Sequence, residues 1–592
     1  MHLLLFLLLS TPDAVFLEHT IVLDCSFPDS GYTETTHETI IPLNAMGVER
    51  YREISASYRN TWESLEISAS ISHWRSGRSD DYAIVRETPH TSLLSGGRLE
   101  SSLREVFIEF PGIEIGDTLE VEIRRDIRYL PMGDFYSYTF FAASRDSIDQ
   151  SLFKVFWPYS RELHILSEGN FETRRYSFDE ETECLVWESG SRNPIPALPF
   201  SGNPVFASPF VTVASSTAEE VSRGLYPVLD KDCMIDYPPV ADSIIAAAGN
   251  TPEDLCGWVS QEIEYLSGNW GKDPGYSPRS PIETIEEKSG VCRDRAVLLL
   301  WLLRRAGYAP SAILTSLSGI PVTYPGSRSF DHMLVTLETS DGRTLFLDPT
   351  NRYSPQGYTY TLRGRGFLPL TPSGSAMRFF PDTCLSDTLS ILVEGSLNTD
   401  SSLIEGSILV RFSGSAEELF RSILANVDPP GSERLLERLF GVLPGANLFI
   451  EGDPSSIDTP VLIKGIGRWE CAVVNTRNGV SMIIPGLETL DVVSSRAAAL
   501  ILPRFRNNVY IETPYTGHLK MVIGNLPAGV PELPEPFESM NYSTAFTIEN
   551  RTLIFDEYLS LEPAEPDSDQ IQRIRQGLLA GLSASFRTVV FR

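Results

Sequence analysis

The segment at residues 288–307, KSGVCRDRAVLLLWLLRRAG, constrains the fold more than any other stretch of the chain. Residues 296–303 read AVLLLWLL, so a helix formed there has no polar side. A helix that is apolar all round must be buried on all sides. The sequence therefore predicts a domain in which other elements enclose this one central helix.

A cysteine, Cys292, stands at the start of this predicted helix. One interpretation is structural, because Cys is small and often buried. The other is chemical, because the positive end of the helix dipole lowers the pKa of a thiol placed there and makes it a nucleophile. Position alone leaves both interpretations open.

A nucleophilic thiol needs a base, and the base needs a group that orients it. Only two of the eight histidines, His332 and His518, follow Cys292 in the chain. His332 opens a predicted strand, HMLVTLE, and Asp348 closes its predicted partner strand in RTLFLDPT. Cys292, His332 and Asp348 are therefore the candidate catalytic residues.

The hairpin between the two strands sets a geometric condition. Strand side chains alternate between faces, so His332 and Asp348 must fall on the same face to meet. A two-residue Asp341–Gly342 loop, with residue 340 opposite 343, would place them on opposite faces. We therefore predict a three-residue loop, Ser340–Gly342, with residue 339 opposite 343, a left-handed Gly342 and a G1-type bulge. A longer loop that brings Asp348 opposite Thr336 would also satisfy the condition.

Three short motifs in this order resemble the transglutaminase-like superfamily: GVCRDRA at 290–296, FDH at 330–332 and LDPT at 347–350. Bacterial members commonly carry G-x-C-x-D/E-x-A, then F-x-H, then L/W-D-P-T. The resemblance implies a papain-like α+β core and thiol acyl-transfer chemistry. It implies Cys292 as nucleophile, His332 as general base and then acid, and Asp348 as the group that orients the imidazole.

The chain departs from related patterns at two positions. Asp331 stands where relatives often carry Asn, and an acidic neighbour favours the imidazolium form of His332. Glu286 stands where papain-type proteases carry a Gln, and an ionised carboxylate cannot donate a hydrogen bond to an oxyanion. Transglutaminase-like enzymes often use an upstream Trp or Tyr with the Cys backbone N–H. Trp270 is the candidate for that role; the alternative is a loop aromatic that caps the core.

The flanks of this core differ from it in pattern. Short alternating segments separated by turns fill residues 20–213, which predicts a β-sandwich-like domain. Strand patterns return after residue 371, with a helical insertion at 415–424 and 433–440 and a last helix at 570–582. We predict an α+β multidomain protein: a signal peptide at 1–14, an antiparallel β domain at 15–215, a transglutaminase-like core at 216–370 and a β-rich domain at 371–592.

Charge and cysteine usage exclude several classes of function. The net charge is −30 and the acidic residues are spread along the chain, which argues against nucleic acid as a partner. The seven cysteines form no CxxC pair, which excludes zinc-ribbon and thioredoxin-type sites. We expect neither a metal nor a cofactor.

The N-terminus carries the signal for location. The apolar run at residues 3–9 is too short to span a bilayer and resembles a secretory signal, although the usual basic residues are missing before it. No later stretch has the length of a membrane helix, so we expect no integral membrane segment. The expected location is periplasmic or extracellular, and cytoplasmic if residues 1–14 are not a signal.

These observations predict an exported bacterial thiol enzyme that acts on peptide or protein amides through a Cys292 thioester. Hydrolysis and transamidation share that thioester, and hydrolysis is favoured because an extracellular site with no evident amine tunnel meets water first. The alternative is a secreted binding or scaffolding protein with a non-catalytic core, which the large β-rich flanks favour. The substrate and any partner protein stay open.

Overall fold

The computed structural model divides the chain into two compact units, one within residues 1–197, 203–352 and 356–381 and the other within 198–202, 353–355 and 382–592. Each unit is described by itself. The predicted four-part division into domains stays a prediction. The residues that the structure describes are 12–26, 31–80, 84–91, 99–128, 135–195, 208–230, 238–266, 277–317, 323–326, 329–339, 341–353, 362, 365–381, 387–426, 429–454, 460–477, 479–486, 515–539, 541–561, 573, 576 and 587–592.

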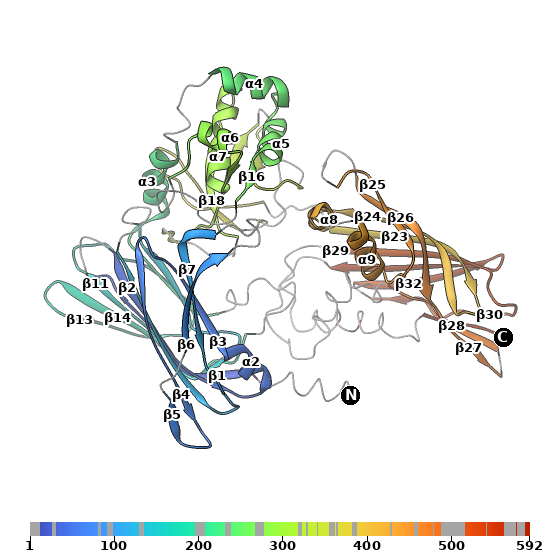
Figure 1. Ribbon diagram of the computed structural model, residues 1–592, viewed down its shortest axis with the longest axis horizontal. Coiled ribbons are helices and arrows are strands. Elements are labelled where there is room, and N and C mark those ends of the chain that lie inside the picture. The colour runs from blue at the N-terminus through green and yellow to red at the C-terminus, as the bar shows by residue number, and fades with distance from the viewer. Residues whose placement is uncertain are drawn as a thin grey trace. The chain divides into compact units, whose positions relative to one another are not determined.

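The N-terminal part of the first unit is built from β-sheets, as predicted (Figure 1). One large sheet has the order β13-β14-β11-β1-β2-β8-β4-β5, with β10 paired to β1. Two three-stranded sheets, β12-β15-β9 and β3-β7-β6, pack against it through separate apolar clusters. The elements are β1 (Ala14–Asp24), β2 (Tyr32–Pro42), α2 (Ala45–Tyr51), β3 (Glu53–Arg59), β4 (Glu63–His73), β5 (Arg78–Asp80), β6 (Ile84–Thr91), β7 (Leu99–Glu109), β8 (Thr118–Ile127), β9 (Ser137–Phe141), β10 (Ser147–Ile148), β11 (Ser151–Pro158), β12 (His164–Glu168), β13 (Glu172–Ser177), β14 (Thr182–Ser189) and β15 (Phe210–Ala214).

The rest of the first unit places helices around one central helix and against an antiparallel sheet of order β20-β19-β18-β21-β22. That central helix, α7, is the apolar segment, and every residue from 293 to 303 is buried, which confirms the prediction. The elements are α3 (Ala218–Asp230), α4 (Pro238–Ala248), α5 (Pro252–Glu262), β16 (Glu264–Tyr265), α6 (Pro281–Glu287), β17 (Ser289–Gly290), α7 (Cys292–Arg305), β18 (Ser311–Thr315), β19 (His332–Glu338), β20 (Thr344–Leu347), β21 (Gly366–Pro369) and β22 (Arg378–Phe379).

Two helices of this region begin at capping boxes, formed by Thr251 with Asp254 and by Ser280 with Glu283. Lys288 ends α6 in the left-handed conformation at φ +49°. Gly290 belongs to β17, where an added Cβ would lie 3.0 Å from Asp294 Cβ. Its small size therefore serves close packing at the entrance of α7.

The hairpin of β19 and β20 has the predicted register. Val335 pairs with Leu347, and Glu338 with Thr344. Beyond them, the Thr339 N–H donates to the Arg343 carbonyl and the Gly342 N–H to the Thr339 carbonyl, while Gly342 has φ +80°. This pattern matches a turn followed by a left-handed glycine. Residue 339 thus lies opposite 343, as predicted; Ser340 lies outside the described residues.

Within the described residues, the second unit is strand-rich and contains the helices α8 and α9. An eight-stranded sheet has the order β25-β26-β24-β23-β29-β33-β32-β31, and a four-stranded sheet the order β27-β28-β34-β30. The predicted helical insertion is present as α8 and α9; the predicted helix at 570–582 lies almost wholly outside the described residues. The elements are β23 (Asp387–Asn398), β24 (Leu403–Ser413), α8 (Ser415–Asn426), α9 (Pro429–Leu439), β25 (Asn447–Glu451), β26 (Leu462–Glu470), β27 (Ala472–Thr476), β28 (Gly479–Ile483), β29 (Tyr515–Gly524), β30 (Pro531–Glu532), β31 (Phe537–Glu538), β32 (Tyr542–Glu549), β33 (Thr552–Leu561) and β34 (Thr588–Phe591).

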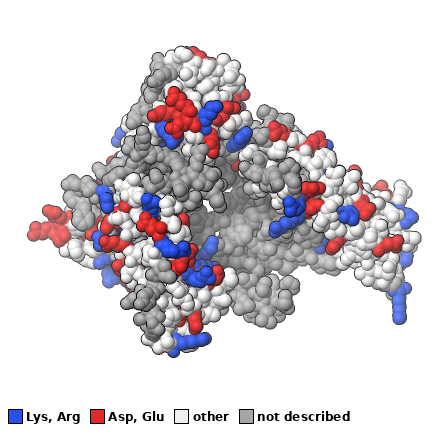
Figure 2. Space-filling model, in the orientation of Figure 1, with Lys and Arg blue, Asp and Glu red and all other residues white. Residues whose placement is uncertain are grey.

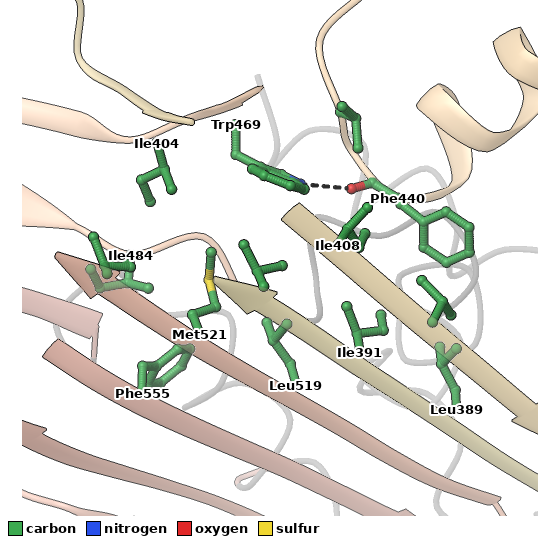
Figure 3. Packing of buried hydrophobic residues seen from close by; sticks show 14 of the residues in the cluster. Leu389, Ile391, Ile404, Ile408, Phe440, Trp469, Ile484, Leu519, Met521 and Phe555 are labelled. Carbon is green, nitrogen blue, oxygen red and sulfur yellow. Dashed lines mark hydrogen bonds between the residues drawn. The ribbon is translucent and has the colours of Figure 1, made fainter. Parts of the chain in front are cut away.

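One apolar cluster joins the helices of the second unit to its large sheet. Figure 3 shows residues of β23, β24, β29 and β33 pointing into it, among them Ile391, Ile408, Met521 and Phe555. The Trp469 indole N–H donates to the Phe440 carbonyl at 3.3 Å, so the one polar group of this buried ring is satisfied.

The surface carries charges of both signs. On the face drawn in Figure 2, acidic and basic side chains are interspersed, with acidic ones gathered near the top of the view. Within the described part of the chain, no helix has the length and apolarity needed to cross a bilayer.

Candidate active site

Cys292 is the first residue of α7 and is partly exposed, whereas the residues that follow it are buried. The Asp294 side chain stabilises the start of this helix. Its fully buried carboxylate accepts the Val291 N–H at 3.2 Å and the Arg279 N–H at 3.0 Å. A carboxylate in the first turn also complements the helix dipole. The motif thus places the Cys292 thiol at the positive end of a rigidly held helix.

His332 and Asp348 meet as the hairpin register requires. His332 Nε2 lies 2.8 Å from Asp348 Oδ2, and both side chains are buried. The other oxygen, Asp348 Oδ1, accepts the Thr350 N–H at 2.9 Å and the Thr350 hydroxyl at 2.6 Å. Because these bonds occupy both oxygens, the carboxylate is fixed in one orientation, and it fixes the imidazole in turn.

The second ring nitrogen, His332 Nδ1, is buried and has no hydrogen-bond partner among the described residues. Cys292 lies close enough to His332 to act on its protonation, through both its charge and its hydrogen-bonding capacity. The thiol and the ring nitrogen do not form a hydrogen bond of ordinary geometry here. Such pairs are commonly loose in enzymes without substrate and tighten in the complex.

The electrostatics of the pair favour an ionised state. Burial opposes the charge on His332, but the Asp348 charge and hydrogen bond, together with Cys292, outweigh it and raise the pKa of His332 well above its ordinary value. Burial likewise opposes the charge on Asp348, but His332 and the Thr350 hydrogen bonds prevail and lower the pKa of Asp348. An imidazolium held between a carboxylate and a thiol is the protonation state from which a thiolate nucleophile acts.

A tyrosine joins the site from upstream. The short parallel pairing of β16 with β17 sets Tyr265 beside Gly290, two residues before Cys292. Burial raises the pKa of Tyr265, and the charges of Cys292 and Asp348 raise it further. The phenol therefore keeps its proton and can act as a hydrogen-bond donor.

The sequence analysis also singled out Trp270, Glu286, Asp331 and His518. Trp270 lies outside the described residues, so its predicted role stays a prediction. Glu286 is exposed on α6. Asp331 is exposed and accepts the Leu317 N–H at 2.6 Å, and its predicted effect on His332 stays a prediction. His518 belongs to the second unit, where its Nε2 lies 3.2 Å from Asp556 Oδ1.

Sequence reasoning missed three residues that touch or support this site: Tyr265, Arg295 and Thr350. Thr350 had a visible signal, because a Thr two residues after an Asp often donates to its carboxylate. Tyr265 had a weaker one, as a Tyr upstream of Cys292 that fits the family's upstream-aromatic pattern. Arg295 had none, since a charged residue inside an apolar helix normally reads as a solvated position.

A family match covers part of the chain, whereas the likeness to one solved structure covers nearly all of it. Residues 28–196 match the model of a family described as a domain of unknown function with a solved structure, DUF3857. A search of curated proteins finds no match.

Among solved structures, the chain is similar to one named as a "putative protease" from Parabacteroides distasonis. The TM-score is 0.62 at 11% identity, over 98% of this chain and 99% of that one. A "putative cysteine protease" from Cytophaga hutchinsonii has a TM-score of 0.18 at 14% identity, over 42% of this chain and 84% of that one. The first likeness shows that the two proteins share a fold over nearly their whole length.

Proposed function

We propose that this protein is a thiol enzyme with a papain-like, transglutaminase-like core that cleaves or transfers the acyl group of peptide or protein amides, with hydrolysis favoured. The observation that carries the proposal is the state of His332. One ring nitrogen is bound to a fixed carboxylate. The other is buried, has no hydrogen-bond partner in the described part of the chain and lies near a cysteine at a helix start. The whole-length likeness to a "putative protease" supports the same class.

The residues divide the chemistry as follows. Cys292 Sγ attacks the carbonyl carbon, and His332 carries the thiol proton. The oxyanion is stabilised by the Cys292 N–H, which has no acceptor within the first turn of its helix, and by the Tyr265 hydroxyl. His332 then protonates the leaving amine, and a Cys292 thioester remains. Water, or an acceptor amine, attacks that thioester with His332 as base.

Export belongs to the same proposal. It rests on the apolar run at residues 3–9 alone, and the corresponding location is periplasmic or extracellular. The proposed substrate is therefore an extracellular or envelope peptide or protein.

The test uses the full-length chain and p-nitrophenyl acetate, a small activated ester that acylates nucleophilic thiols. We expect a burst of nitrophenol and an acetyl group on Cys292 in peptide mass spectra. Cys292→Ser should abolish both, and His332→Ala should slow acylation at least about 100-fold. Cys471→Ser, which changes a buried thiol of the second unit, is the matched control and should leave the burst intact.

One further measurement decides the reaction class. A peptide mixture supplied with a fluorescent primary amine separates hydrolysis from transamidation by the product that accumulates. In the burst experiment, a wild-type burst equal to that of Cys292→Ser would overturn the proposed enzymatic activity and favour a binding or scaffolding protein with a non-catalytic core.

A further inference from the structure

A charged side chain lies buried one helical turn after the candidate nucleophile. Arg295 is 1% exposed and ranks among the largest fully buried side chains of the described chain. Burying a guanidinium is unfavourable unless charges and hydrogen bonds compensate for the lost water. A residue kept there in spite of that cost calls for an explanation beyond packing.

Arg295 contacts Val259 and Tyr265, and Tyr265 belongs to the candidate site. Arg295 Nη2 donates to the Val259 carbonyl in α5 at 3.0 Å. Its Cζ lies 5.7 Å from the centroid of the Tyr265 ring, within the range of a cation–π contact. Nε is buried without a hydrogen-bond partner among the described residues. Among the described residues, one hydrogen bond and one aromatic face therefore hold this cation.

Arg295 stays charged at neutral pH. Burial lowers its pKa to about 10, while the charge of Asp348 acts in the opposite direction. The guanidinium is thus a permanent positive charge within electrostatic reach of Asp348. It offsets a carboxylate that is itself buried.

We propose that Arg295 is a positioning residue for the reaction. Its guanidinium lies against the ring of Tyr265 and holds the phenol hydroxyl beside Cys292, where the oxyanion develops. The inference rests on the proposed function, because it assigns Arg295 a role in stabilising the oxyanion of that same acyl transfer. The competing role is structural: a tie between α7 and the Val259 carbonyl of α5.

The experiment is a double-mutant cycle on the full-length protein with p-nitrophenyl acetate as substrate. Arg295→Met, Tyr265→Phe and the double variant are compared by kcat and KM. We expect Arg295→Met to lower kcat about 10-fold with KM unchanged, since an interaction made only in the transition state is lost. In the Tyr265→Phe background the same change should have little further effect, because Arg295 acts through that hydroxyl.

A second variant keeps the test decisive if Arg295→Met folds poorly. Arg295→Gln retains a donor for the Val259 carbonyl but loses the charge and the stacked plane, so it should lower kcat as much. Arg421→Met removes an equally buried arginine of the second unit and is the matched control; it should leave kcat unchanged.

The outcomes separate the two proposals. The positioning role would be overturned if folded Arg295→Met had the kcat of the wild type. It would also be overturned if the fold-losses of kcat in Arg295→Met and Tyr265→Phe multiplied in the double variant. In both cases the proposed function would stand. A wild type no more active than Cys292→Ser would remove the proposed function itself.

Discussion

Two hairpins of this protein carry a buried side-chain pair at the same diagonal offset. In the β32–β33 hairpin, Tyr542 pairs with Leu559, and its hydroxyl bonds Glu557, two residues before that partner, at 2.5 Å. In the β19–β20 hairpin, His332 bonds Asp348 at 2.8 Å, and the register places Asp348 at the same offset. Both hairpins therefore use the same strand register to bring a carboxylate to the side chain of the first residue of a strand.

The turns and the chemistry differ. The Tyr–Glu hairpin turns through two residues, Asn550 and Arg551, both at positive φ, whereas the His–Asp hairpin needs a third loop residue and Gly342. A phenol donates its single proton to Glu557. The imidazole of His332 binds Asp348 with one nitrogen, and its other nitrogen is the proposed partner of Cys292. The comparison teaches that the register forms the pair in both hairpins, and that the identity of the first residue decides whether a second ring nitrogen is present for the proposed chemistry.

The largest expected difference comes from neutralising each carboxylate. Asp348→Asn should lower kcat/KM for p-nitrophenyl acetate by about 10²–10⁴-fold, because the imidazole loses its orienting anion and its favoured tautomer. Glu557→Gln should leave kcat/KM unchanged. Steady-state kinetics with a folded-state check by circular dichroism measures both. Equal losses of kcat/KM in the two variants would contradict the proposed difference between the two hairpins.

A second comparison removes the phenol oxygen from Tyr265 and from Tyr542. Tyr265→Phe should lower kcat about 10–10³-fold with little change in the melting temperature, because it removes one oxyanion donor. Tyr542→Phe should lower the stability of the second unit by about 1–3 kcal/mol, because Glu557 is buried and loses a hydrogen bond, and leave kcat unchanged. Kinetics and calorimetry on both variants test this; a kcat loss in Tyr542→Phe would contradict it.

The pH dependence of stability should belong to the His–Asp hairpin. The raised pKa of His332 contributes stability that is fully present below its unfolded value of about 6.5 and is lost as pH rises through the folded value. The lowered pKa of Asp348 contributes stability that is present above its unfolded value of about 3.9 and is lost as pH falls through the folded value. Asp348→Asn removes both contributions.

Calorimetric melting of the first unit, followed upward from a pH of about 6.5, measures the alkaline part of this effect. The wild type should lose stability more steeply than Asp348→Asn, and Glu557→Gln should follow the wild type. Parallel curves for all three proteins would show that His332 and Asp348 are not coupled.

The smallest expected effect concerns the turns. Gly342→Ala should destabilise the first unit by about 1 kcal/mol, because an L-residue is strained at φ +80° while the added Cβ meets nothing within 4 Å. Asn550→Ala, at φ +48°, should destabilise the second unit by a similar amount, because Asn tolerates this region better than Ala. Melting temperatures compare them. A stabilised Gly342→Ala would argue that the described turn is not the one in solution.

Several features of the fold followed from local sequence. The apolar run at 296–303 required a buried helix, because no arrangement of that segment presents a polar face. The capping residues Thr251 and Ser280 marked helix starts, since their side chains satisfy N–H groups that no helix satisfies for itself. The side-chain alternation rule and the need for His332 to meet Asp348 excluded the two-residue loop and left two registers for β19 and β20, and the register predicted first is the one observed.

What the sequence could not decide are contacts that depend on elements far apart in the chain. The nearness of Tyr265 to Cys292 arises from the pairing of β16 with β17, two residues in each strand, and such a short pairing has no periodic signal. The burial of Arg295 depends on α5 and β16 closing over α7, although local pattern favours a solvated position. Local sequence thus indicated most elements and the candidate nucleophile, base and carboxylate. Only tertiary packing decided which phenol and which cation surround them, because burial and electrostatic neighbours are properties of the assembled core.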